Sequence, residues 1–218
     1  MTRGGVPSLK ALYAQGYGEM AHWFTVYVRE AHPGENYPAP SLIGEKRAHA
    51  VDLRWLEALP WPVLVDDIDG TVHRAYGELP NSAYVIDAEG RVAFKDQWAS
   101  AGTLRRALDA LRERGGRGAP IAGGVERRPH PLGPMAFGWP AIRRAGSGAV
   151  RDVLLKAPPL ALMLQLGRAL RPGIAPLARR TRPLPTPVRL AIAVVTAALI
   201  GGLALRPWKR AAADGRRR

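Results

Sequence analysis

A glutamate and a histidine stand two positions apart, directly after a strand-like run. Residues 24–38 read FTVYVREAHPGENYP, so the apolar stretch ends at Arg29 and Glu30, and His32 precedes Pro33. In open α/β sheets, catalytic and ligand-binding residues usually lie at the carboxyl ends of buried parallel strands. A carboxylate beside an imidazole fixes the tautomer of the ring, which suits proton transfer. We therefore expect Glu30 and His32 within hydrogen-bonding or one-water distance, although spacing alone favours an ordinary surface pair.

The element that positions this pair is a strand over residues 23–28. These residues are β-branched or aromatic and carry no charge, which is typical of a strand covered on both faces. Pro33 disfavours a helical conformation at His32 and prevents a helix from running through the loop. The pattern predicts an imidazole held in a fixed loop beside Glu30.

Composition and charge limit the possible functions. The 218 residues contain no cysteine, which excludes disulfides, thiolate nucleophiles and cysteine zinc sites within them. The net charge is +14, but acidic and basic residues nearly balance over residues 1–100, and the later excess is almost entirely Arg. We expect no nucleic-acid partner for the folded part. The first residues lack the apolar run of a secretory signal, which favours a cytoplasmic domain.

Residues 1–115 predict alternating helices and strands. A helix begins near Pro7, a second covers residues 45–59 with Val51 and Trp55 in its apolar stripe, and a short strand covers residues 61–66. Residues 83–87 and 91–95 predict a hairpin with Gly90 in its turn, and residues 103–114 predict an amphipathic helix. Three aspartates at positions 66, 67 and 69 lack the spacing of a calcium loop, so a solvated turn is the favoured interpretation.

The remainder of the chain predicts attachment to a membrane. Residues 116–149 are rich in Gly, Pro and Arg and predict a linker, and residues 150–187 predict amphipathic helices at a membrane surface. Residues 188–208 predict a transmembrane helix around LAIAVVTAALIGGLAL, with a buried core helix as the alternative. Residues 209–218 form a basic tail.

Two stretches carry a resemblance to a known family. VYVREAHPGE over residues 26–35 resembles the signature of the iodothyronine deiodinase family, in which a strand runs into Glu-Ala-His. PVLVDDIDGTVHRAYGELPNSAYVID over residues 62–87 is similar to a later stretch of that family and its bacterial relatives. The resemblance covers about residues 7–114. It implies an α/β fold with a thioredoxin-like domain that is incomplete at its N-terminus.

The resemblance also implies roles for site residues and partners. Tyr27, Glu30 and His32 match the positions that place substrate and move protons. A small-molecule substrate and a thiol reductant are implied, with no bound cofactor and no metal. Pro80 resembles the cis-proline that faces a thioredoxin active site, and residues 81–83 lack the Arg that the family usually carries there.

The family's nucleophilic cysteine or selenocysteine follows a central strand and directly precedes the first helix. Residue 1 falls where that helix begins, so we expect a start codon assigned too late. Without the central strand, the strand over residues 23–28 and the hairpin do not pair with each other.

Three functions compete. The first is a deiodinase-like or peroxiredoxin-like thiol or selenol oxidoreductase, inactive as printed because its nucleophile is missing. The second is a non-catalytic, membrane-anchored thioredoxin-like binding module. The third is a basic membrane-surface protein whose tail carries the function.

Overall fold

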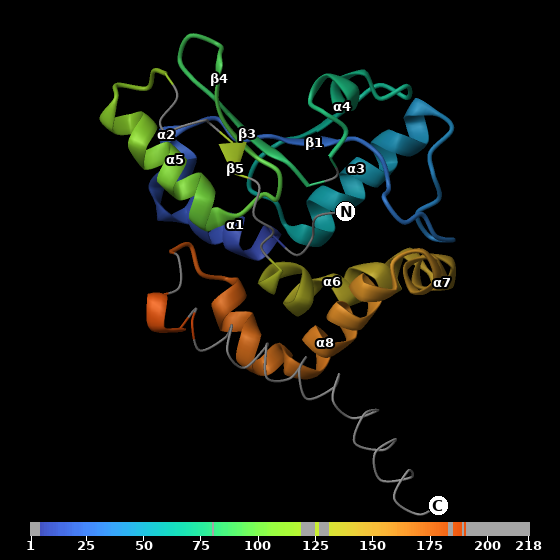
Figure 1. Ribbon diagram of the computed structural model, residues 1–218. Coiled ribbons are helices and arrows are strands. Elements are labelled where there is room, and N and C mark those ends of the chain that lie inside the picture. The colour runs from blue at the N-terminus through green and yellow to red at the C-terminus, as the bar shows by residue number, and fades with distance from the viewer. Residues whose placement is uncertain are drawn as a thin grey trace, which may run out of the picture. The chain divides into compact units, whose positions relative to one another are not determined.

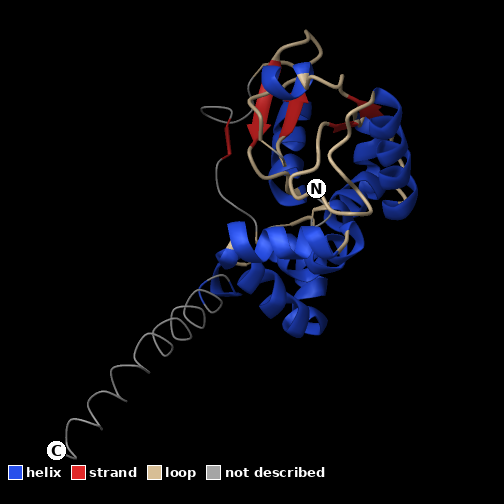
Figure 2. Cartoon of the chain, turned by 90° about the vertical axis from the view of Figure 1, so that its right-hand side faces the viewer, coloured by secondary structure: helices blue, strands red, loops and turns tan. Residues whose placement is uncertain are grey.

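The strands of this α/β protein form two separate short sheets. In the computed structural model, β1 (Thr25–Tyr27) pairs in parallel with β2 (Val63–Val65), with Val26 opposite Leu64. The second sheet has the order β3-β4-β5, in which β3 (Ala83–Ile86) is antiparallel to β4 (Val92–Asp96) and β5 (Val125–Glu126) is parallel to β4. No ladder joins the two sheets within the described residues, and Figure 2 shows the strands in two groups. This separation agrees with the expectation that the first strand does not pair with the hairpin.

The structure describes residues 5–79, 81–118, 125–126, 131–182, 185–188 and 190. The segment Met1–Arg182 forms one compact unit, and Pro183–Arg218 forms a second. Pro80, which is predicted to be a turn proline, lies outside the described residues. The same holds for the predicted transmembrane helix and basic tail, apart from residues 188 and 190.

The helices of the first half follow the predicted order. α1 (Val6–Leu12) is followed by a kinked segment, Tyr13–Tyr17, in which Gln15 and Gly16 are not helical, and then by α2 (Gly18–Met20). α3 (Ile43–Glu57) joins β1 to β2. α4 (Thr71–Ala75) is a short helix after β2, and α5 (Ala101–Glu113) follows the hairpin (Figure 1). The predicted helix over residues 103–114 and the hairpin with Gly90 at φ +81° are confirmed.

Two apolar clusters hold this half together. The first joins the hairpin to α5 through Phe94, Leu104 and Leu108, and Leu12 of α1 is fully buried in it. The second joins β1 to α3 through Tyr27 and Leu53, together with neighbours that include Ala50, Leu59 and Trp61. Burying each large side chain contributes roughly 1.5–3 kcal/mol. The parallel pair is therefore fixed against α3, which carries part of the candidate site.

The prediction that the first strand is covered on both faces is wrong. Tyr27 is 4% exposed against α3, whereas Phe24 is 56% exposed and Val26 is 39% exposed. Successive strand residues point to opposite faces. Only one face of β1 is therefore covered in the described part of the chain.

The predicted stripe of α3 is also wrong, although the helix itself is confirmed. Val51 is 55% exposed and Trp55 is 79% exposed, while Lys46, Ala50 and Leu53 are buried. The buried set is spaced by three and four residues, as the inner face of a helix must be. The buried face of α3 is therefore a different one from the face that carries Val51 and Trp55.

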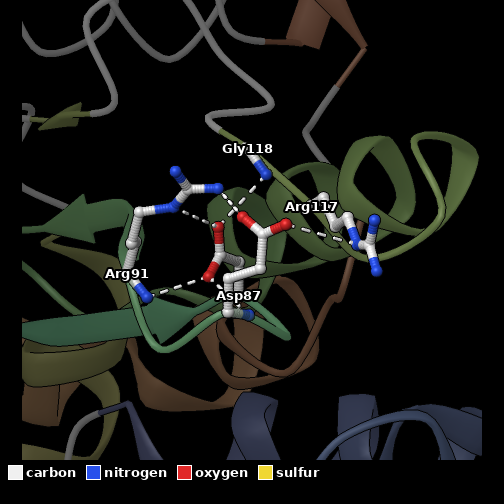
Figure 3. Close-up of polar contacts among 5 residues, drawn as sticks. Asp87, Arg91, Arg117 and Gly118 are labelled. Atoms are coloured by element: carbon white, nitrogen blue, oxygen red, sulfur yellow. Dashed lines mark hydrogen bonds and ion pairs between the residues drawn. The ribbon is translucent and has the colours of Figure 1, made fainter.

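A charged cluster closes the hairpin turn. The carboxylate of Asp87 accepts hydrogen bonds from the backbone N–H groups of Glu89, Arg91 and Gly118 at 3.0, 2.8 and 3.2 Å. The guanidinium of Arg91 lies 3.6 Å from the same carboxylate (Figure 3). The guanidinium of Arg117 lies 3.4 Å from Oε1 of Glu89. The backbone N–H of Arg91 is the main cause that lowers the pKa of Asp87. These contacts tie the glycine-rich segment after α5 to the hairpin turn. The cluster therefore has a structural role.

The range predicted as a linker contains helices instead. α6 (Leu132–Ala145) lies within residues 116–149, and it is followed by α7 (Ser147–Lys156) and α8 (Pro158–Ala178). Figure 1 shows these three helices gathered together, and Trp139, Val153 and Leu164 are buried between them. They belong to the same compact unit as the sheets, so the predicted boundary near residue 115 does not separate two units.

The described helices were compared with the length and hydropathy that a membrane span requires. None of them is by itself long and apolar enough to cross a bilayer. Only α7 and α8 taken together pass that test, and they are bent by 119° where they meet.

Candidate active site

Tyr27 and Glu30 meet at the carboxyl end of β1. The phenolic hydroxyl of Tyr27 donates a short hydrogen bond to Oε1 of Glu30. Nδ1 of His49, on α3, lies 3.3 Å from the same hydroxyl oxygen. A hydroxyl that donates to the carboxylate can accept from a protonated Nδ1, so the three groups form a continuous chain of proton donors and acceptors.

The imidazole of His49 is held between two tyrosine rings. Its ring centroid lies 6.3 Å from that of Tyr27 and 5.2 Å from that of Tyr37, with both pairs close to edge-to-face. Tyr37 in turn donates to Oδ2 of Asp52, one helical turn beyond His49, at 3.2 Å. Edge-to-face packing restricts rotation of a ring. The ring of His49 therefore keeps Nδ1 towards the hydroxyl of Tyr27.

His32 takes a partner from the helical region rather than from its own loop. Its Nδ1 lies 2.9 Å from Oδ2 of Asp152 on α7, and Nζ of Lys156 lies 2.5 Å from the other carboxylate oxygen. The hydrogen bond from His32 comes first, and that from Lys156 second, among the causes that lower the pKa of Asp152. No direct hydrogen bond joins His32 to Glu30 in the described residues, and a one-water arrangement stays a prediction.

The loop that carries His32 is clamped by the start of α7. The carboxylate of Glu35 accepts hydrogen bonds from the hydroxyl of Ser147 at 2.5 Å and from the N–H of Gly148 at 2.8 Å. The Ser147 hydroxyl, followed by the Gly148 N–H, lowers the pKa of Glu35. A carboxylate at a helix N-terminus also interacts favourably with the helix dipole.

The backbones of this loop and the end of α6 touch. A Cβ added to Gly34 would lie 2.2 Å from the carbonyl oxygen of Ala145, so only glycine fits there. The side-chain amide of Asn36 donates to the carbonyl of Arg144 at 3.0 Å, and the N–H of Asn36 donates to Ala145 at 3.1 Å. The loop after β1 is thus fixed at both ends, by the strand and by the helices.

The aspartates after β2 have a structural role. Asp66 is 2% exposed, and its carboxylate accepts from the backbone N–H groups of Asp67, Val72 and His73, each at 2.9 Å. Asp67 accepts from the N–H of Thr71 at 2.8 Å, and hydrogen bonds from Thr71 lower its pKa. These carboxylates cap α4, as the turn interpretation requires, although the Asp66 side chain is buried rather than solvated.

The structure brings Tyr27 and Glu30 together and adds a residue that sequence reasoning missed. His49 is three positions after buried Lys46 and one before buried Ala50, so it lies on the edge of the inner face of α3. A sequence analysis that assigned Lys46, Ala50 and Leu53 to the inner face of α3 would have identified His49 as a site residue.

Comparison of the chain with protein-family models, with curated proteins and with solved structures gives no match.

Proposed function

We propose that this chain belongs to a thioredoxin-like, deiodinase-like oxidoreductase that acts through a thiol or selenol. The observation that carries the proposal is the chain from Glu30 through Tyr27 to His49 at the carboxyl end of a parallel strand. Such a chain can deliver a proton to a leaving group and return to its starting state through solvent. The Glu-Ala-His signature of residues 30–32 and the strand–helix–strand–hairpin–helix order support the family.

The nucleophile of this proposal comes from outside the printed sequence, because the 218 residues contain no cysteine. The separation of the parallel pair from the hairpin supports the same idea, since β1 and β3 each keep an edge without a ladder partner in the described residues. A strand that carries the nucleophile would give those edges a ladder partner.

The direct test compares two forms of the protein with dithiothreitol as reductant. One is translated from the printed Met1 and the other from the reading frame upstream of it. Each is assayed for reduction of hydrogen peroxide and for release of iodide from an iodinated phenol. Activity confined to the longer form supports the proposal. An upstream frame without cysteine or selenocysteine, or a longer form without thiol-dependent activity, would contradict it.

A non-catalytic binding module is the second candidate, favoured by the absence of any thiol in the sequence. In that case Tyr27 and Glu30 would bind a ligand rather than move protons.

We also propose membrane attachment through residues 188–208. Deleting the chain from Val188 onward should release it to the soluble fraction, and unchanged fractionation would contradict that attachment.

A further inference from the structure

A cavity of about 410 Å³ lies between α6 and α8. Its walls combine apolar groups with four guanidinium groups. On α6 the lining residues recur every three or four positions, which places them on one helix face. The lining residues are Ala136, Trp139, Pro140, Arg143, Arg144, Arg168 and Arg171. We call this cavity the arginine pocket.

The two helices that form the arginine pocket are packed closely through glycines. A Cβ added to Gly167 of α8 would lie 2.2 Å from the carbonyl oxygen of Met135, and one added to Gly138 of α6 would lie 2.6 Å from Cδ2 of Leu164. Buried Leu164 completes the contact. The backbones cannot separate without losing this packing, so the walls of the pocket are held in place.

The pocket carries positive charge that the protein only partly neutralises. No carboxylate is among its lining residues. Arg144 lies 3.6 Å from Oε1 of Glu57, and Arg171 lies over the ring of Phe137 at 5.9 Å. Arg143 and Arg168 have no ion-pair partner within the described part of the chain. Guanidinium groups bind phosphate oxygens through paired hydrogen bonds, and a dianionic ligand relieves the repulsion among them.

Trp139 adds an aromatic surface to the wall of the arginine pocket. Trp139 is 8% exposed, and its indole N–H donates no hydrogen bond among the described residues. Buried polar groups in native proteins almost always have partners. The indole ring itself lines the pocket and offers a surface for an apolar group of a ligand beside the guanidinium groups.

The exposed leucines of α8 argue against a lipid headgroup as the ligand of the pocket. Leu162, Leu166 and Leu170 are each more than half exposed and form one stripe of α8. At 100° per residue this stripe lies roughly opposite the face that carries Leu164, Arg168 and Arg171. A membrane that covers the leucines therefore cannot place its phosphates in the pocket.

We propose that the arginine pocket binds a soluble small molecule that bears a phosphate monoester or pyrophosphate group. This site is separate from the proposed redox function and stands whether or not that function holds. Its specificity comes from Arg143 and Arg168, while Trp139 contacts the remainder of the ligand.

The test uses the full ¹⁵N-labelled chain and inorganic pyrophosphate as the probe. The indole N–H resonance of Trp139, assigned by its loss in Trp139→Phe, should move saturably on titration. Arg168→Gln and Arg143→Gln should each weaken binding by about tenfold or more, because each removes a charge-assisted hydrogen bond. Arg151→Gln serves as the matched control, since Arg151 is an exposed arginine of α7 outside the pocket. It should leave the affinity unchanged.

Three results would overturn the proposal. The first is a Trp139 resonance that does not move, or moves without saturation at concentrations well above about 1 mM. The second is an equal loss of affinity in Arg151→Gln, which indicates diffuse attraction to a basic surface. The third is movement of the resonance by vesicles of phosphatidylglycerol and phosphatidylcholine but not by pyrophosphate, which would assign the pocket to a lipid.

Discussion

Replacing Tyr27 by Phe removes one oxygen from the centre of the candidate site. The hydroxyl is the only group that joins Glu30 to His49 in the described residues, and the tyrosine side chain around it is buried. A hydrogen bond to a charged group contributes about 1.5–3 kcal/mol, and a neutral one about 0.5–1.5 kcal/mol. Because Glu30 is only half-buried, water can partly replace the lost donor. We therefore expect a loss of about 1–2 kcal/mol in the free energy of unfolding.

The assay is thermal unfolding of the full chain followed by circular dichroism. For a chain of this size, the expected loss lowers the midpoint by about 2–8 °C. Tyr76→Phe is the control, because Tyr76 is 41% exposed and its hydroxyl has no hydrogen bond in the described structure. It should unfold like the wild type. A Tyr27→Phe protein as stable as this control would refute the hydrogen-bonded chain.

Three further predictions concern the helices and the clamped loop. Gly34→Ala should destabilise the protein and speed cleavage of the loop in limited proteolysis, because the new Cβ meets a backbone carbonyl at 2.2 Å; Gly44→Ala, in open space on α3, should not. Leu164→Ala should cost about 2–5 kcal/mol in urea unfolding, whereas Leu162→Ala, 62% exposed, should change stability little. Asp152 has a pKa below its ordinary 3.8 in the folded chain, so its contribution is present above that pH and is lost as pH falls through the folded pKa. In Asp152→Asn the free energy of unfolding should therefore fall less steeply as the pH drops below about 4 than in the wild type. The same pH dependence in both proteins would contradict the ion pair.

Local signals in the sequence predicted the order of helices and strands in the first half of the chain. The hairpin follows from Gly90 between two apolar runs, and its left-handed conformation is present in the structure. α5 follows from leucines and alanines at helical spacing, and Leu104 and Leu108 are buried as expected. Both elements depend on interactions between residues close in the chain, which patterns of a few residues can encode.

The missed features depend on contacts between distant residues. α6 contains Pro140 and two glycines, which have low helix propensity, and packing against α8 stabilises it instead. The phase of α3 was misjudged because Lys46 is buried, with Nζ donating to the carbonyl of Asp67 at 2.5 Å, while larger apolar residues face solvent. The partner of His32 lies 120 positions away, at Asp152. No local pattern identifies such a partner.

The most direct test of the proposed function measures kcat of thiol-dependent reduction by the form that includes the upstream frame. Glu30→Gln keeps the size of the side chain but removes the carboxylate that accepts from Tyr27. Glu19→Gln makes the same chemical change at an exposed position on α2. If Glu30, Tyr27 and His49 move protons in the reaction, Glu30→Gln lowers kcat by about 10²-fold or more and Glu19→Gln leaves it unchanged. Equal kcat values for the two variants would contradict the role assigned to Glu30.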